Sequence, residues 1–344
     1  MNAFAFSPGD TISFKAGEVW REALVPSVNG SALGHITFKS YSSGNKPKLV
    51  GSVKPGTWTS LGGNKWRSAA NQCPFDVGNV ILNGGALFGI KKANLADLTQ
   101  QGHFWYDATN KEVVMYSTQN PGTFYTSMEC ALKRHIVNLT NRHYIKLEGL
   151  ELVYGGAHGV SGTNCSHIVI NGCSISYMGG SYLSGTVRYG NGIQFYNAAH
   201  DCTVTNNYIR QIYDTGITNQ GDTAAGHQQY NLYYQNNTID NCEWSFEIWS
   251  YSASSSMDSI YFENSLCRYA GDTWAHSQRP DPSGAHVQFF ASQADATNIF
   301  IRYNTFNTST GVMIAAQYSP YWNDIGNVVL DHNDYVQASG DFAQ

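Results

Sequence analysis

The sequence predicts an all-β protein, a right-handed parallel β-helix with a small antiparallel β insert near residues 54–130. Three observations support this fold. A loose unit recurs from residue 142 onward at intervals of about 20–40 residues, as in solenoid proteins. Each unit contains a second short strand with strict alternation of apolar and polar residues. Charged residues make up only 13% of the chain, against 42% hydrophobic residues, which is typical of a folded chain with a large core.

The N-terminal segment fits the same plan. The stretch "GDTISFKAGEVWREALVPSVNG" and the later "HITFKSYSSGNKPKLVGS" predict the first coils. The repeat is then interrupted: "GTWTSLGGNKWRS" and "QGHFWYDATNKEVVMYS" indicate antiparallel hairpins, the second turning at residues 108–111. "KKANLADLTQQ" predicts a short helix with Asn94 as its N-cap. We therefore expect one domain over residues 1–344, with residues 54–130 as an insert subdomain.

The first half of each repeated unit is a short β-type run that ends in Asn or Glu. Asn suits a bend because its side chain tolerates left-handed backbone and stacks from coil to coil. We expect about ten coils with these residues near one bend. The residues are Glu148, Asn171, Asn206, Asn236, Asn264, Asn304 and Asn333.

The second half of each unit is "GIQFY", "GITNQ", "FEIWS", "HVQFF" or "GVMIA". Alternation predicts an inward column of Ile193, Ile217, Phe246, Val287 and Val312. The outward column is then Gln194, Thr218, Glu247, Gln288 and Met313. A β-sandwich is the alternative fold, but Asn-Gly and Asp-Gly hairpin turns are scarce between these strands.

Composition excludes several classes of protein. The net charge is −5 with no basic run, which argues against a nucleic-acid partner. No apolar stretch is long enough to span a membrane. The seven cysteines show no CxxC spacing, so we expect small core residues and no metal centre. The start "MNAFAFSPGD" lacks the regions of a signal peptide, which leaves either an intracellular protein or one whose signal has been removed.

Three connections are much longer than the others: residues 177–190, 220–230 and 268–284. Long loops on one face of a repeat scaffold usually carry function. The stretch "WAHSQRPDPSGAHVQFF" begins within the last of these loops. It contains two histidines, an arginine and an aspartate, although the chain has few charged residues.

These loops predict a groove of acids, imidazoles and guanidinium groups beside the outward column. Asp214 and Glu243 are expected at equivalent positions on successive coils, about 4.8 Å apart. The catalytic candidates are Asp214, Glu247, His276, Glu243 and Asp281. The substrate-binding candidates are Arg188, Arg279, His286, Gln194, Gln288, Tyr213, Trp249 and Trp274. Aromatic faces among carboxylates and arginines suit a polysaccharide, so we expect a poly- or oligosaccharide partner.

Some of these residues have a structural alternative. Asp214 is equally well read as the cap of a turn, and Asp281 as a partner that fixes Arg279. His286 suits a hydrogen-bonded residue within the stack. His167 and His200 precede strands and are read as turn residues.

At these residues the chain resembles carbohydrate-active right-handed parallel β-helix proteins. The resemblance rests on the N-terminal coils, "GHFWYDATNKEVVMYS", "NGIQFYNAAHDCTVTNNYI" and "RPDPSG". It is greatest to β-helical glycoside hydrolases of the xylanase and fucosidase type within the pectate-lyase-like superfamily. It implies a secreted or periplasmic enzyme that acts on polysaccharides. The Gly-His-Gly and Arg-Ile-Lys motifs of polygalacturonases are absent, and "GAHV" is only a faint echo of them.

Three functions remain open on the sequence. A glycoside hydrolase without a cofactor needs an acid and a second carboxylate, for which Asp214 and Glu247 are the first pair. A polysaccharide lyase or C5-epimerase needs a base such as His276 and a group that neutralises a uronate, either Arg188, Arg279 or Ca²⁺. A non-catalytic glycan-binding solenoid or tailspike fragment needs neither, and would not place Asp214, Glu247 and His276 in one pocket.

Overall fold

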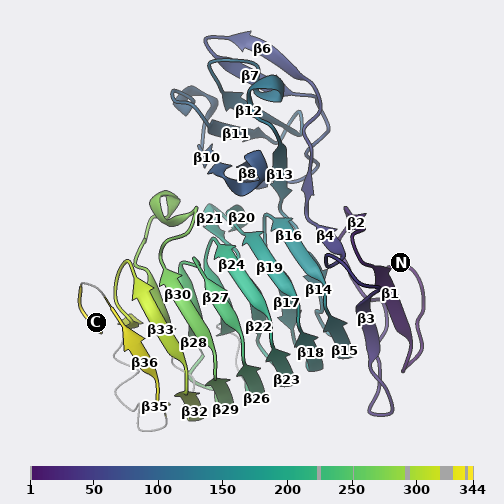
Figure 1. Ribbon diagram of the computed structural model, residues 1–344, viewed down its shortest axis with the longest axis vertical. Coiled ribbons are helices and arrows are strands. Elements are labelled where there is room, and N and C mark those ends of the chain that lie inside the picture. Colours follow the sequence, from purple (N-terminus) through teal and green to yellow (C-terminus); the bar gives the residue numbers. More distant parts are fainter. Residues whose placement is uncertain are drawn as a thin grey trace.

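The computed structural model describes residues 2–222, 226–250, 252–290, 295–317, 328–337 and 340–343. Three long parallel sheets, called A, B and C, run side by side along the molecule. Between residues 143 and 317 each turn of the chain adds one strand to sheet A, then one to sheet B and then one to sheet C. Figure 1 shows the strands stacked from the N-terminal to the C-terminal end. This is the predicted parallel β-helix, and "CTVTNNYI" pairs with "LYYQNNTI" in parallel as expected.

Sheet A consists of β1 (Thr11–Lys15), β3 (Ile36–Tyr41), β15 (His143–Glu148), β18 (Ser166–Asn171), β23 (His200–Thr205), β26 (Gln228–Gln235), β29 (Ser256–Glu263), β32 (Asp295–Arg302) and β35 (Val328–Asp331). Sheet B consists of β2 (Val19–Trp20), β4 (Lys48–Val50), β16 (Glu151–Gly155), β19 (Ser174–Met178), β24 (Tyr208–Ile212), β27 (Thr238–Asp240), β30 (Leu266–Ala270), β33 (Thr305–Ser309) and β36 (Asp334–Val336). Sheet C consists of β14 (Val137–Asn138), β17 (Val160–Thr163), β22 (Ile193–Tyr196), β25 (Thr215–Gly221), β28 (Trp244–Ser250), β31 (Ala285–Phe290) and β34 (Ile314–Gln317). Within the described ranges, sheets A and B therefore have nine strands each, one coil fewer than expected.

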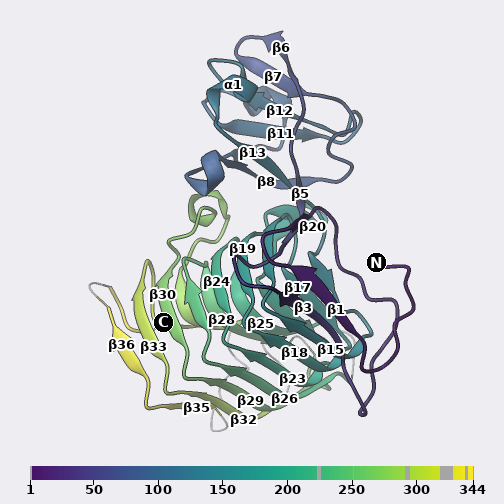
Figure 2. The same ribbon diagram turned by 45° about the vertical axis from the view of Figure 1, so that its right-hand side comes forward.

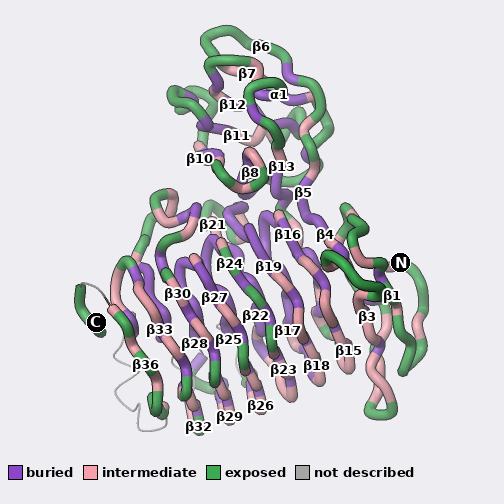
Figure 3. The backbone as a smooth tube through the Cα atoms, viewed as in Figure 1, coloured by how far each residue is buried: buried purple, intermediate pink, exposed green. Residues whose placement is uncertain are grey.

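The core fills the space that the three sheets enclose. Aliphatic and aromatic side chains of different sheets pack against one another there, as between Phe246 of sheet C and Phe262 of sheet A, whose ring centroids are 4.4 Å apart. Figure 3 shows buried and partly exposed residues alternating along the strands. All seven cysteines are buried and unpaired, as predicted. No helix of the described residues is long and apolar enough to cross a membrane.

The bend between sheets A and B uses two asparagine positions rather than one. Asn206, Asn236 and Asn264 adopt left-handed backbone with φ between 52° and 58°. The next residue in each coil forms a buried ladder, in which Asn207 N donates to Asn237 Oδ1 over 3.0 Å. Of the predicted residues, Asn304 and Asn333 belong to this ladder, where Asn304 N donates to Asn333 Oδ1.

The second strands pair in the predicted register. Gln194, Thr218, Glu247 and Gln288 form one column, and Ile193, Ile217, Phe246 and Val287 form the buried column beside it. The last coil is displaced from the prediction by two residues, because Ile314 pairs with Val287 and Ala315 with Gln288.

The predicted positions of Val312 and Met313 are therefore wrong. Met313 is completely buried in the core, and its carbonyl accepts hydrogen bonds from the backbone N–H groups of His286 and Val287. Val312 is only partly buried and packs on the small cluster around Trp244. Met313 lies at the corner where the chain enters sheet C, and alternation does not hold at a corner.

The insert forms two sheets of its own above the N-terminal coils (Figure 1). One sheet has the order β10-β11-β12-β7-β6 and the other β5-β13-β8-β9. The elements are β5 (Ser52–Val53), β6 (Trp58–Gly62), β7 (Lys65–Ser68), β8 (Val77–Leu82), η1 (Asn83–Gly85), β9 (Leu87–Phe88), β10 (Ile90–Lys91), η2 (Leu95–Asp97), β11 (His103–Asp107), β12 (Glu112–Tyr116), α1 (Pro121–Phe124) and β13 (Met128–Leu132). Both predicted hairpins are present, β6 with β7 and β11 with β12.

The short helix predicted after residue 91 is a single 3-10 turn. Asn94 precedes it, but its amide donates to the Asp97 side chain and does not cap the backbone. The loop that contains η3 (His276–Gln278) rises from the helix to meet the base of the insert (Figure 2). There Gln278 accepts from Lys91 N at 3.1 Å and donates to Gly89 O at 3.1 Å.

Candidate active site

A groove of about 890 Å³ runs over the outer face of sheet C. Its floor comes from β17, β22, β25 and β28, whose outward side chains include Ser161, Gln194, Gln220 and Glu247. One wall is the hairpin of β20 (Ser181–Ser184) and β21 (Val187–Tyr189), within the predicted loop 177–190. The loop 268–284 contributes Arg279, Pro280 and Asp281.

Glu247 lies in the floor of the groove and is only 3% exposed. Its Oε2 accepts hydrogen bonds from Thr218 Oγ1 and Gln220 Nε2, each at 2.7 Å. Burial raises the pKa of Glu247 to about 7, and the nearby Asp214 carboxylate adds to the rise. The two hydrogen bonds oppose it. This carboxyl group therefore keeps its proton close to neutral pH.

Asp214 lines the same groove and is 7% exposed. Its Oδ1 accepts a hydrogen bond from Arg279 Nη1 at 2.9 Å, and the other guanidinium nitrogen lies 3.1 Å from Asp281 Oδ1. Burial raises the pKa of Asp214, and the charge of Arg279 opposes the rise. Asp214 thus forms an ion pair with Arg279, whereas the side chains that donate hydrogen bonds to Glu247 are neutral.

Aromatic side chains surround these acids. Tyr189, Tyr196, Trp244 and Trp249 all line the groove. Trp244 is fixed by a hydrogen bond from its Nε1 to Ser283 Oγ at 2.9 Å, and the Arg279 guanidinium lies 4.7 Å from its ring centroid. Flat rings of this kind offer stacking surfaces for sugar rings.

Basic side chains line the wall of the groove nearest the insert. Lys133 and Arg134 come from the end of the insert, and Arg188 comes from the hairpin. Arg188 donates from Nε to Gly180 O at 2.7 Å and lies 5.1 Å from the Tyr213 ring centroid. His135 is nearby, and burial lowers its pKa to about 4, so this imidazole is neutral at pH 7.

The structure brings seven of the predicted site residues together in the groove. They are Asp214, Glu247, Asp281, Arg188, Arg279, Gln194 and Trp249. The predicted proximity of Asp214 and Glu243 is also present, because Thr215 pairs with Trp244 on the next coil and Glu243 N donates to Asp214 O.

Glu243 and His276 do not line the groove, contrary to the prediction. Glu243 is fully buried, and its Oε1 accepts from Ser283 N at 2.8 Å and from Gly284 N at 3.1 Å. His276 Nδ1 contacts Glu243 Oε2 at 3.0 Å. Both residues therefore hold the 268–284 loop in place.

Four of the predicted binding residues are buried elsewhere. His286 faces the core, where it contacts Ser245 Oγ and Thr308 O, and burial lowers its pKa to about 4. Gln288 is also fully buried, one coil beyond Glu247. Tyr213 and Trp274 pack together with Phe88 where the helix meets the insert, with 5.5 Å between the Tyr213 and Trp274 ring centroids. None of these four lines the groove, so the structure gives their predicted contact with a substrate no support.

Trp244 and Gln220 were not among the predicted site residues. The register contained the signal for Gln220, because it lies two residues after Thr218 on the same outward face. Trp244 gave no such signal, since its role depends on how the distant Arg279 folds back over it.

Comparisons with known proteins were made on this fold. No family model matches the chain, and no curated protein matches it. Among solved structures, a glycoside hydrolase aligns over 98% of this chain and 89% of its own, with 9% identity and a TM-score of 0.54. A family 28 exopolygalacturonase from Yersinia enterocolitica aligns over 97% and 62%, with 12% identity and a TM-score of 0.49. An alginate lyase from a Paenibacillus species aligns over 97% and 93%, with 11% identity and a TM-score of 0.44.

At such low identity the likeness shows the fold alone. Together with the three parallel sheets, it shows that the chain has a right-handed parallel β-helix fold, as the sequence predicts.

Proposed function

We propose that this protein is a glycoside hydrolase that cleaves a poly- or oligosaccharide bound in the groove on sheet C. One observation carries the proposal. Asp214 and Glu247 are both buried in the floor of a single aromatic-lined groove, where Asp214 pairs directly with Arg279 and Glu247 accepts hydrogen bonds from neutral side chains. Two carboxyl groups in different environments are what glycoside hydrolysis requires.

Glu247 serves as the general acid in this proposal. Its pKa of about 7 leaves it protonated in mildly acidic solution and half protonated near pH 7, so it can donate a proton to the glycosidic oxygen as the bond to the anomeric carbon breaks. Thr218 and Gln220 hold the carboxyl group in a fixed orientation.

Asp214 serves as the second carboxylate. Arg279 stabilises its ionised form, which then either takes a proton from an attacking water or attacks the anomeric carbon directly. The distance between the two carboxyl groups in the enzyme–substrate complex decides between these two routes. A distance of about 5 Å corresponds to retention of configuration at the anomeric carbon, and about 6.5–9.5 Å to inversion. A solved glycoside hydrolase shares this fold.

The basic wall favours a second candidate, a polysaccharide lyase. Lys133, Arg134 and Arg188 line one side of the groove, where they would neutralise a uronate carboxylate. The neutral His135 beside them would accept the α-proton. In this candidate Glu247 and Asp214 would only contact the sugar.

Product analysis separates the two reactions. The protein is incubated with a panel of neutral and uronate-containing polysaccharides, and the products are assayed for new reducing ends and for near-ultraviolet absorbance. Hydrolysis gives reducing ends without absorbance, whereas a lyase gives unsaturated products that absorb. Absorbing products would contradict the hydrolase proposal, and binding without any cleavage of the bound glycan would contradict both.

We also propose that the enzyme acts outside the cytoplasm, where polysaccharides are found.

A further inference from the structure

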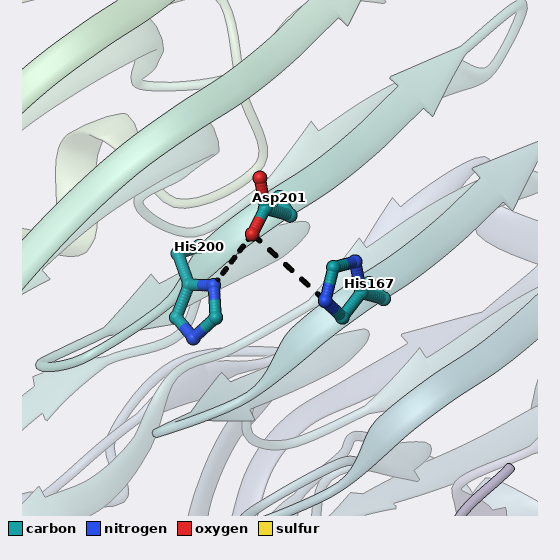
Figure 4. Close-up of side chains that lie close together, drawn as sticks. All are labelled: His167, His200 and Asp201. Atoms are coloured by element: carbon teal, nitrogen blue, oxygen red, sulfur yellow. Dashed lines mark hydrogen bonds and ion pairs between the residues drawn. The ribbon is translucent and has the colours of Figure 1, made fainter. Parts of the chain in front are cut away.

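We propose that His167, His200 and Asp201 bind a single divalent ion of the zinc type on the outer surface of sheet A. Figure 4 shows the Asp201 carboxylate between the two imidazoles. Within the part of the chain that the structure describes, this is the one group of three His, Cys, Asp or Glu side chains whose ligand atoms all lie within 4.8 Å of one another. The sequence analysis expected no metal centre and read both histidines as turn residues.

The distances suit a small ion with nitrogen and oxygen ligands. His200 Nδ1 lies 2.8 Å from Asp201 Oδ2, and His167 Nε2 lies 3.9 Å from the same oxygen. Tetrahedral zinc with ligands at about 2.0–2.2 Å places ligand atoms about 3.4 Å apart. The two distances lie on either side of this value, so ion binding would move Asp201 slightly away from His200 and closer to His167.

The backbone places the ligands on neighbouring coils. Ser166 pairs with His200 in the parallel register of β18 and β23, so His167 and Asp201 occupy equivalent positions. Both have left-handed backbone, with φ of 52° and 53°. The paired residues on the neighbouring coils, Tyr144 and Asn231, have the same left-handed backbone, so this corner repeats along the sheet and places the two side chains one coil apart. An ion bound here would link two successive coils.

Neighbouring side chains hold the ligands in orientation. The Tyr144 ring stacks on His167 at 4.2 Å, and the Tyr230 ring stacks on His200 at 4.7 Å. Asn231 Nδ2 donates to Asp201 Oδ1 at 2.8 Å, which leaves Oδ2 directed at both imidazoles. Contacts of this kind around the ligands are typical of metal sites, where they fix the orientation of ligating groups.

A plain ion pair between His200 and Asp201 explains only part of this arrangement. It does not account for His167, whose Nε2 is directed at the same oxygen from a distance too great for a hydrogen bond. The three side chains are 29–35% exposed, so an ion can reach them from solvent. Two imidazoles and one carboxylate favour Zn²⁺, Co²⁺, Ni²⁺ or Cu²⁺ over Ca²⁺ or Mg²⁺, which prefer sites built of oxygen ligands.

Cobalt titration of the metal-free protein tests the site, because Co²⁺ bound by nitrogen and oxygen ligands absorbs visible light. We expect saturation at one equivalent of Co²⁺, with the absorbance lost when Zn²⁺ is added. Asp201→Asn and His167→Asn should each weaken Co²⁺ binding by at least about tenfold. Asparagine suits both positions because it tolerates left-handed backbone.

The control is His332→Asn. His332 forms a similar contact with the neighbouring Asp331 at 2.7 Å, but it does not belong to a group of three ligands among the described residues. This variant should bind Co²⁺ as the wild type does. Circular dichroism checks the fold of each variant, and His200→Gln replaces any variant that does not fold. Wild-type protein that binds no Co²⁺, or equal Co²⁺ affinity in the folded ligand variants and the wild type, would overturn the proposal.

Discussion

Arg279 donates a hydrogen bond from Nη1 to Asp214 Oδ1 over 2.9 Å, and the two side chains are only 6% and 10% exposed. A charge pair this deeply buried loses much of its hydration, so its contribution depends on both partners being present. The pair also distinguishes the two acids of the groove. Asp214 is held beside a cation, whereas burial keeps Glu247 protonated up to a pH of about 7.

Removal of the cation should destabilise the protein strongly. Arg279→Gln leaves the buried Asp214 carboxylate without its charge partner, which typically costs about 3–5 kcal/mol in free energy of unfolding. The matched control is Arg302→Gln. Arg302 contacts Glu263 at 2.6 Å, and Glu263 is as buried as Asp214, but Arg302 itself is 33% exposed, against 6% for Arg279. Water can reach the Glu263 carboxylate through the space that the arginine leaves, so the loss should be smaller than for Arg279→Gln. Urea unfolding of both variants measures the difference, and equal losses would contradict this description of the pair.

The raised pKa of Glu247 predicts a specific dependence of stability on pH. The pKa is about 7 in the folded protein and near its ordinary value of 4.5 in the unfolded chain. The folded state therefore binds the proton more tightly, and the resulting stabilisation is fully present below pH 4.5. It is lost as the pH rises through about 7, and the loss approaches about 3 kcal/mol because each unit of pKa shift corresponds to about 1.4 kcal/mol.

Glu247→Gln should remove this dependence, because glutamine does not ionise. Urea unfolding at pH 5 and pH 8 should show that the wild type loses more stability than the variant over this interval. Parallel behaviour of the two proteins would mean that Glu247 is already ionised at pH 5. The same pKa predicts that hydrolysis slows above a pH of about 7, where the acid loses its proton.

Glu243 should act through the 268–284 loop rather than on the substrate. Its carboxylate accepts backbone hydrogen bonds from Ser283 and Gly284 and contacts His276. Glu243→Gln removes the charge that these contacts share, which should cost about 1–3 kcal/mol and loosen the loop. Limited proteolysis should then cut within residues 271–284 faster than in the wild type. An unchanged rate of cleavage there would exclude this role for Glu243.

The inner column should carry much of the stability of the helix. Phe246 is fully buried between Tyr234 and Phe262, so Phe246→Ala should cost about 3–5 kcal/mol. Phe124→Ala, at a residue 41% exposed on the insert, should cost far less. Thermal unfolding compares them. An unchanged melting temperature for Phe246→Ala would show that this side chain is not in the core.

Alternation was sufficient to predict the strands of sheet C but not its corners. The column from Gln194 to Gln288 follows directly from residues that alternate in and out along each strand. His286 and Met313 lie where the chain turns into sheet C, and there both face the core. Because a turn breaks the period of two residues, no count along the sequence reveals this.

Tyr213 and Trp274 lie outside the groove for a different reason. Aromatic residues beside a predicted groove are reasonable candidates for sugar binding, but here the insert covers them. The insert lies more than a hundred residues earlier in the chain, and a contact of that kind depends on how the two parts pack together. Glu243 and His276 likewise depend on the path of a long loop, which short-range patterns do not determine.

The central claim is that Asp214 and Glu247 together catalyse hydrolysis in the groove. The most direct test measures turnover of Asp214→Asn and Glu247→Gln on a glycan that the wild type cleaves, with Glu263→Gln as the matched control. Glu263 is a carboxylate of similar burial in sheet A and does not line the groove. We predict that turnover falls by at least about 10²–10⁴-fold in each groove variant while the folded variants still bind the glycan, and that the control keeps its activity. Wild-type turnover in either folded groove variant would contradict the claim.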